Sequence, residues 1–139
     1  MSAQPIQVVE AFYDAASRRD GEALVELVTN SFHVDAAVEW PAGLPYGGRV
    51  EGAPTLRKVF AALATPEPVL GPENLEVVSV VDGGRQIAVQ VAFDWRANGA
   101  TISSGALELW TFDEGLVTEV RAYYWDTAAC QALMQAQPA

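Results

Sequence analysis

Hydrophobic residues in the first half of the chain recur with the spacing of amphipathic helices. The pattern predicts one helix over about residues 5–18 and a second that Asp20 caps and that ends near Asn30. A third helix has Pro54 in its first turn and ends before two later prolines. The apolar positions that define the three helices are Ile6, Val9, Phe12, Tyr13 and Ala16; Leu24, Leu27 and Val28; and Leu56, Val59, Phe60 and Leu63.

From about residue 75 the hydrophobic pattern changes to the period of two that is typical of strands. Glycine-containing turns separate these strands, and Asn98-Gly99 is the strongest hairpin signal among them. A short strand over Ala36–Trp40 comes earlier, and a short helix over about Thr127–Met134, capped by Asp126 or Thr127, comes last. The four strands of the second half are predicted at Leu75–Asp82, Gln86–Arg96, Thr101–Asp113 and Leu116–Trp125.

This order of elements describes a single α+β domain over residues 1–139. We expect a curved antiparallel sheet that wraps around the N-terminal helix, with two further helices closing it into a cone. The mouth of such a cone is a natural pocket for a small molecule.

The segment Val38–Gly52 is rich in prolines, glycines and aromatic rings. Glycines allow unusual backbone angles, prolines fix them, and Trp40 and Tyr46 supply large surfaces with a polar tip. The segment is therefore either the rim of a ligand cavity or a turn-rich connection whose rings fill the core.

The acidic charge balance limits the classes of partner. A formal net charge of −10, from 18 acidic and 8 basic residues, disfavours nucleic acid and anionic membrane surfaces. No apolar run approaches the roughly 20 residues of a membrane span, and Met1–Pro5 lacks the basic start of a secretory signal. We therefore expect a cytoplasmic protein.

With one cysteine, Cys130, and one histidine, His33, the sequence predicts no metal site.

Alternation along the last two predicted strands singles out one acid. Ala106, Glu108 and Trp110 share a face, as do Ala122 and Tyr124 on the following strand. If the aromatic face points inward, Glu108 is a carboxyl among rings, its pKa is raised, and it can transfer protons near neutrality. The alternative is an outward Glu108 paired with Arg121 or Arg96.

Four segments give the chain a family resemblance: Phe12-Tyr13-Asp14, Val38-Glu39-Trp40-Pro41, Pro45-Tyr46-Gly47-Gly48 and Tyr123-Tyr124-Trp125-Asp126. With the order of elements, they resemble the nuclear-transport-factor-2-like superfamily, within it the SnoaL-like polyketide cyclases and ketosteroid-isomerase-like proteins. The resemblance covers about residues 5–135 and implies a cystatin-like roll. It does not fix the reaction, because this fold carries many activities.

Some catalytic residues of the related enzymes have a counterpart in this sequence, and others do not. It implies that Trp40 stands where ketosteroid isomerases carry their basic aspartate, and that Phe12 or Tyr13 takes the place of their oxyanion-binding tyrosine. Glu108 matches their second, acidic donor. Ala106 and Ala122 stand where limonene-type epoxide hydrolases need an arginine and an aspartate.

We therefore expect a cofactor-independent enzyme of the isomerase or cyclase type, acting by acid–base chemistry on an apolar polyketide-like or steroid-like substrate of secondary metabolism. The alternatives are an epoxide hydrolase or epoxide-opening cyclase, and a non-catalytic binding or dimerisation module.

Tyr123 and Trp125, on the outer sheet face, suggest a homodimer. His33 is a candidate base, or else makes local hydrogen bonds where the second helix ends. The predicted catalytic residues are Glu108, Tyr46 and Tyr124, and the predicted substrate-binding residues are Trp40, Trp110, Phe93, Tyr13, Phe12, Ala122 and His33.

Overall fold

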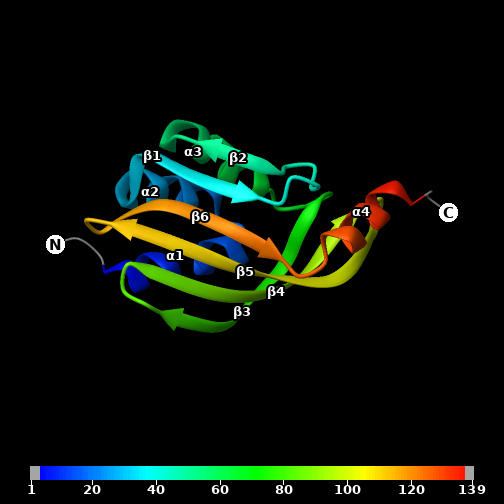
Figure 1. Ribbon diagram of the computed structural model, residues 1–139. Coiled ribbons are helices and arrows are strands. Elements are labelled where there is room, and N and C mark those ends of the chain that lie inside the picture. Colours follow the sequence, from blue (N-terminus) through cyan, green and yellow to red (C-terminus); the bar gives the residue numbers. More distant parts are fainter. Residues whose placement is uncertain (1–3, 137–139) are drawn as a thin grey trace.

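The computed structural model describes residues 4–136, which form four helices and six strands. The outermost residues of the predicted domain, 1–3 and 137–139, lie outside this range, as does most of the segment considered for a secretory signal. The fold is α+β, as predicted, with three helices on one face of a curved sheet (Figure 1). In chain order the elements are α1 (Pro5–Ser17), α2 (Gly21–Ser31), β1 (Phe32–Trp40), β2 (Gly48–Glu51), α3 (Ala53–Leu63), β3 (Gly71–Asp82), β4 (Gln86–Ala97), β5 (Ala100–Asp113), β6 (Leu116–Tyr124) and α4 (Thr127–Gln135).

Two of the helices, α2 and α4, begin at an aspartate that caps them. Asp20 accepts a hydrogen bond of 3.0 Å from the backbone N–H of Ala23, and Asp126 accepts one of 3.0 Å from Ala129. Each bond satisfies one of the free N–H groups of a first helical turn. The predicted bounds of all four helices are confirmed to within a few residues.

The six strands lie in the order β2-β1-β6-β5-β4-β3. The expectation of a wholly antiparallel sheet is wrong in one place, because β1 pairs with β6 in parallel. A parallel pair needs a long crossover, and here most of the chain separates the two strands. The sheet is therefore mixed.

The structure also extends and adds strands. β1 begins at Phe32 and β3 at Gly71, earlier than predicted, and β2 was not predicted at all. β2 has only four residues and pairs with β1 inside the glycine-rich segment. The hairpin at Asn98-Gly99 is confirmed, with positive φ at both residues, as a two-residue turn of this type requires.

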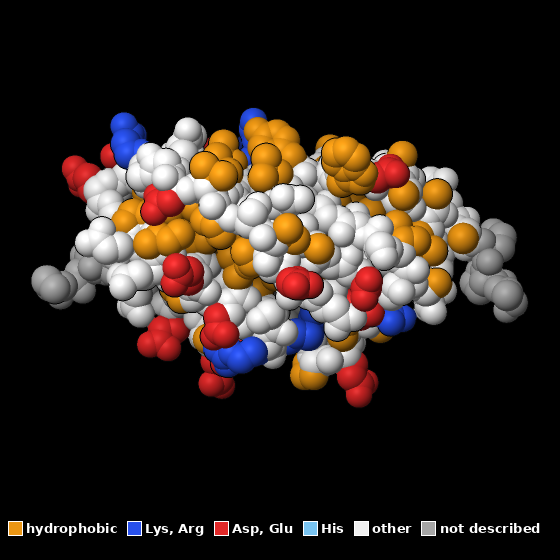
Figure 2. Space-filling view, turned by 90° about the horizontal axis from the view of Figure 1, so that it is seen from below, with side chains coloured by type: hydrophobic (Ala, Val, Ile, Leu, Met, Phe, Trp, Pro, Cys, Tyr) orange, Lys and Arg blue, Asp and Glu red, His pale blue; other side chains and the backbone are white. Residues whose placement is uncertain are grey.

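The core lies between the concave face of the sheet and the helices. β4 alternates regularly, and its inward residues from Ile87 to Ala97 are buried. The convex face keeps several hydrophobic side chains exposed, among them Leu107, Tyr123 and Trp125. Figure 2, which looks onto the side where β3 lies, shows hydrophobic side chains gathered along one edge and acidic side chains spread singly.

Two global features bear on function. No helix within residues 4–136 has the length and apolar character that a membrane crossing requires. In the same range no three His, Cys, Asp or Glu residues come together as a metal site would need.

Candidate functional site

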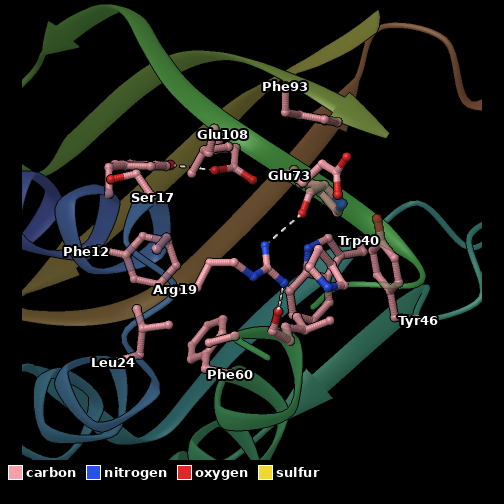
Figure 3. Close-up of a pocket in the computed structure, with 18 of the residues that line it drawn as sticks. Phe12, Ser17, Arg19, Leu24, Trp40, Tyr46, Phe60, Glu73, Phe93 and Glu108 are labelled. Carbon is pink, nitrogen blue, oxygen red and sulfur yellow. Dashed lines mark hydrogen bonds between the residues drawn. The ribbon is translucent and has the colours of Figure 1, made fainter. Parts of the chain in front are cut away.

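A cavity of about 350 Å³ lies between the concave sheet face and the helices (Figure 3). α1 and α3 supply one wall, strands β4 to β6 supply the opposite wall, and the proline-rich segment before β3 closes one side. Most of the lining side chains are apolar or aromatic, which suits a largely hydrophobic small molecule. They include Phe12, Leu24, Val38, Trp40, Phe60, Leu63, Pro66, Pro68, Leu70, Phe93, Val120 and Ala122.

One carboxyl group stands on this apolar wall. Glu108 lies on β5 opposite Val89 of β4 and Ala122 of β6, two small neighbours that leave space in front of it. Its Oε1 accepts a hydrogen bond of 2.5 Å from the hydroxyl of Tyr13 on α1, dashed in Figure 3. Tyr13 in turn accepts a hydrogen bond of 2.9 Å from the indole N–H of Trp110. The hydrogen bonds from Trp110 to Tyr13 and from Tyr13 to Glu108 fix one carboxylate oxygen of Glu108 and leave the other for a ligand.

The setting of this pair changes its acidity. Burial raises the pKa of Glu108 above its ordinary value, and the hydrogen bond from Tyr13 opposes that shift only in part. Burial also raises the pKa of Tyr13 well above its ordinary value, and the nearby Glu108 charge adds to the effect. Tyr13 therefore stays protonated and acts as a donor, while Glu108 is the group that gains and loses a proton.

Two tyrosines form a second polar group in the cavity. The hydroxyls of Tyr46 and Tyr124 lie 2.7 Å apart, and the indole N–H of Trp95 donates to Tyr46 at 2.9 Å. The two hydroxyls share one hydrogen between them, so their second hydrogen has no acceptor within the described residues. This free O–H is available to a ligand oxygen. Burial raises the pKa of Tyr46 to about 12 and raises the pKa of Tyr124 well above its ordinary value, so both remain donors at neutral pH.

Two glycines hold the ring of Tyr46 in place. A Cβ at Gly47 would come within 2.1 Å of the carbonyl oxygen of Pro41, so only glycine fits this turn. Gly71, at the start of β3, has φ +94° and lies against the Tyr46 ring, 3.4 Å from where its Cβ would stand. The rim interpretation of the glycine-rich segment therefore agrees with the structure, since Trp40 and Tyr46 both line the cavity.

Two charged side chains also line the cavity and were not predicted. Glu73 at the start of β3 makes a bidentate ion pair with Arg96 at 2.8 and 3.0 Å, which lowers the pKa of Glu73 and keeps it ionised. Arg19, which follows α1, extends its guanidinium group to backbone carbonyls at the end of α3, in the segment after it and at the start of β3. No local sequence pattern indicates that either residue lines a cavity, because their positions depend on contacts with residues distant in sequence.

Eight of the ten predicted site residues line the cavity, and their roles stay predictions. These eight are Glu108, Tyr46, Tyr124, Trp40, Phe93, Tyr13, Phe12 and Ala122. Glu108 points into the cavity and is not the outward residue, paired with Arg121 or Arg96, of the alternative. Arg121 pairs instead with Glu39 at 3.0 Å, and Arg96 with Glu73.

The other two predicted residues lie elsewhere. Trp110 is fully buried behind Tyr13 and packs edge-on against Phe12, so it supports the site without lining the cavity. His33 is exposed at the start of β1, and its Nδ1 accepts a hydrogen bond of 3.0 Å from the N–H of Asp35. The predicted cavity positions of Trp110 and His33 are therefore wrong, and His33 makes the local hydrogen bond of the alternative.

The sequence model of the SnoaL-like domain family matches residues 9–120 of this chain. No curated protein matches it. A solved NTF2-like structure and one with a cystatin-like fold match with TM-scores of 0.77 and 0.76, respectively, which confirms the predicted fold class.

Three further solved structures share the fold at low sequence identity. TerC, co-crystallised with polyporic acid, is 22% identical, with a TM-score of 0.76 and coverage of 96% of this chain and 100% of its own. A putative SnoaL-like polyketide cyclase from Jannaschia sp. CCS1 is 19% identical, with a TM-score of 0.71 and coverage of 96% and 94%. An LEH-like epoxide hydrolase from M. tuberculosis is 15% identical, with a TM-score of 0.68 and coverage of 94% and 90%.

Proposed function

The chain belongs to the SnoaL-like domain family, and from this membership and its cavity we propose that it is a small-molecule enzyme of the isomerase or cyclase type. The single observation that carries the proposal is Glu108, a carboxyl on an apolar cavity wall with one oxygen held by Tyr13. A carboxyl whose pKa is raised toward neutrality can both take and return a proton.

The proposed reaction begins at a C–H bond next to a carbonyl group of the substrate. The free oxygen of Glu108 removes that proton, and the C–H electron pair forms an enolate. The free O–H of the Tyr46–Tyr124 pair donates to the enolate oxygen, where negative charge develops. Because both tyrosines are protonated and preoriented, they stabilise this charge without rearrangement.

Two outcomes follow from the same enolate. If Glu108 returns its proton to another carbon, a double bond moves and the product is an isomer. If the enolate carbon attacks a second carbonyl in the same molecule, a C–C bond forms, and Glu108 gives its proton to the new alkoxide. The Jannaschia neighbour is described as a putative polyketide cyclase, which favours testing both outcomes.

The substrate we propose is a flat, largely apolar polyketide-like or steroid-like carbonyl compound. Aromatic rings from several elements line the cavity, including Phe12, Trp40, Phe60 and Phe93. TerC, of the same fold, was crystallised with polyporic acid. We place such an enzyme in the secondary metabolism of the cytoplasm, with side chains alone supplying its acid–base groups.

A non-catalytic binding domain is the second candidate. The observation in its favour concerns Glu73, the other carboxylate on the cavity wall, which forms an ion pair with Arg96. Among the described residues that line the cavity, Glu108 is therefore the one acid without an ion-pair partner. Epoxide opening, the activity of the M. tuberculosis neighbour, has less support here. Ala106 and Ala122 are buried where the resemblance places the charged groups of limonene-type epoxide hydrolases.

Deuterium exchange tests the proposed proton transfer without knowledge of the substrate. Incubation of 2-tetralone in D₂O with the protein should exchange its α-hydrogens faster than buffer does. Glu108→Gln should lower the protein-dependent rate by about 10²-fold or more. The matched control is Glu76→Gln, on the exposed surface of β3, which should keep the full rate. An unchanged rate in Glu108→Gln, or no acceleration by the wild-type protein, would contradict the proposal.

A further inference from the structure

Arg19 occupies a backbone position that rarely carries a long charged side chain. It follows α1 with φ +53°, the left-handed region, and the bonds Arg19 N–H to Ala16 and Asp20 N–H to Ala15 complete a Schellman motif around it. Glycine is the usual residue here, because a side chain costs roughly 1 kcal/mol in this conformation. The arginine side chain therefore stands in a place that backbone geometry alone would give to glycine.

The guanidinium group of Arg19 lines the cavity and donates only to backbone carbonyls. Its Nη2 donates to Leu63 at 2.6 Å and its Nη1 donates to Pro72 at 3.2 Å, the two dashed lines at Arg19 in Figure 3. Its Nε donates to Thr65. A guanidinium group carries five N–H donors, so one N–H on each terminal nitrogen has no partner in the part of the chain that the structure describes.

The positive charge of Arg19 is also not neutralised by an ion pair. No carboxylate within residues 4–136 lies within 4.0 Å of it. Glu73 is the acid on this part of the wall, and its two oxygens are engaged by Arg96. Arg19 thus has no direct ion-pair partner among the described residues, although the charge of Glu73 still acts on it at longer range. It presents two free donors in a chain of net charge −10.

We propose that Arg19 binds an acidic oxygen group of the substrate, a carboxylate or an ionised enol, in the cavity. The two free N–H groups can donate to both oxygens of a carboxylate, the geometry in which arginine recognises anions best. The aromatic body of the ligand then lies between Arg19 and Glu108. This inference deepens the proposed function and rests on it, because it defines which carbonyl substrates that cavity prefers.

Binding of a neutral and an anionic form of one ring system tests the inference. The probes are 2-naphthoate and its methyl ester, titrated into the protein at pH 7 and followed by tryptophan fluorescence. The wild-type protein should bind the acid at least about 10-fold more tightly than the ester, as charge-assisted hydrogen bonds imply. Arg19→Asn should abolish this preference and leave ester binding nearly unchanged. Asparagine tolerates the left-handed backbone of this position, which favours correct folding.

Two further variants separate recognition from a purely structural role. Arg19→Lys keeps a positive charge and should retain part of the preference for the acid. Arg85→Gln removes an exposed charge far along the β3–β4 hairpin and should leave both affinities unchanged. If Arg19 only held the segment before β3 in place, Arg19→Asn would weaken acid and ester equally, and that result would overturn the inference.

Wild-type protein that binds ester and acid equally, or that does not bind the acid, would overturn it too. This test reads binding alone. A wild-type protein without a preference for the acid therefore counts against the role of Arg19 whatever Glu108 does in the exchange assay, and absence of exchange counts against the proposed function whatever Arg19 binds.

Discussion

The hydroxyl of Tyr13 donates a hydrogen bond of 2.5 Å to Oε1 of Glu108, joining α1 to β5 at the wall of the cavity. Tyr13 is almost completely buried, so its hydroxyl cannot exchange this partner for bulk water. The bond stabilises the carboxylate form, while burial destabilises it, and burial prevails. The acidity of Glu108 is therefore set by two opposing effects that mutation can separate.

Tyr13→Phe should raise the pKa of Glu108 further, because it removes the donor that favours the carboxylate. The acid limb of the pH–rate profile for 2-tetralone exchange, where the carboxylate is the active base, should then move to higher pH. The variant also leaves the buried N–H of Trp110 without an acceptor, at a cost of about 1–3 kcal/mol in unfolding free energy. Glu76→Gln, on the exposed surface of β3, is the control and should shift neither quantity. A Tyr13→Phe profile that stays in place would show that this bond does not tune Glu108.

Glu108→Gln should make the protein more stable at neutral pH. A folded-state pKa above the unfolded value means that, between the two, the native state holds more protons than the unfolded chain. The contribution of Glu108 to stability is therefore fully present below the ordinary pKa of 4.5 and declines as pH rises through the folded-state pKa. Melting temperatures of the two proteins should converge near pH 4 and separate toward pH 8, with Glu76→Gln following the wild type. A wild-type melting temperature that stays equal to that of Glu108→Gln across this range would contradict the raised pKa.

Gly71→Ala should disturb the tyrosine pair specifically. The new Cβ would suffer the strain of a positive φ and would also stand 3.4 Å from the Tyr46 ring. Gly84→Ala has the same kind of strain, at φ +83°, with nothing within 4 Å, and serves as the matched control. Both variants should lose roughly 1 kcal/mol or more of unfolding free energy, but only Gly71→Ala should lower the exchange rate. Equal rates in the two variants would mean that Tyr46 can move without effect on catalysis.

The convex sheet face should hold two copies of the chain together. Leu107 and Tyr123 face each other across β5 and β6, and both are about half exposed, at 47% and 50%. Apolar side chains in such a patch favour burial against a partner. Light scattering should give about 30 kDa, twice the 14.9 kDa of one chain, and Leu107→Glu should reduce it to the monomer. Val34→Glu, at an exposed hydrophobic residue of β1, is the control and should keep the dimer. A wild-type mass of about 15 kDa at micromolar concentration would exclude this interface.

The sequence predicts which face of a strand a residue takes better than it predicts what that residue meets. Alternation placed Glu108 and Trp110 on the same inward face, and both are there. Only Glu108 reaches the cavity, because rings from α1 and β1 cover Trp110. Periodicity gives the direction of a side chain but not the depth of the space in front of it.

Contacts between distant segments account for the remaining differences. Arg19 owes its place to carbonyls between residues 63 and 72, and no local pattern connects these positions. The strand Gly48–Glu51 is too short to show alternation, and the parallel pairing of β1 with β6 joins segments far apart in the chain. Such features arise when the whole domain packs, so a reading of local periodicity does not reveal them.

The pKa of Glu108 is the quantity on which the proposed chemistry depends most directly. Titration of the protein labelled with ¹³C at the glutamate side-chain carboxyl carbon, followed by NMR, measures it in the wild type. One glutamate resonance should titrate above the ordinary value of 4.5, and the same resonance should be missing from Glu108→Gln. If the resonance lost in Glu108→Gln instead titrates at or below 4.5, Glu108 is an ordinary carboxylate and the proposed proton transfer is wrong.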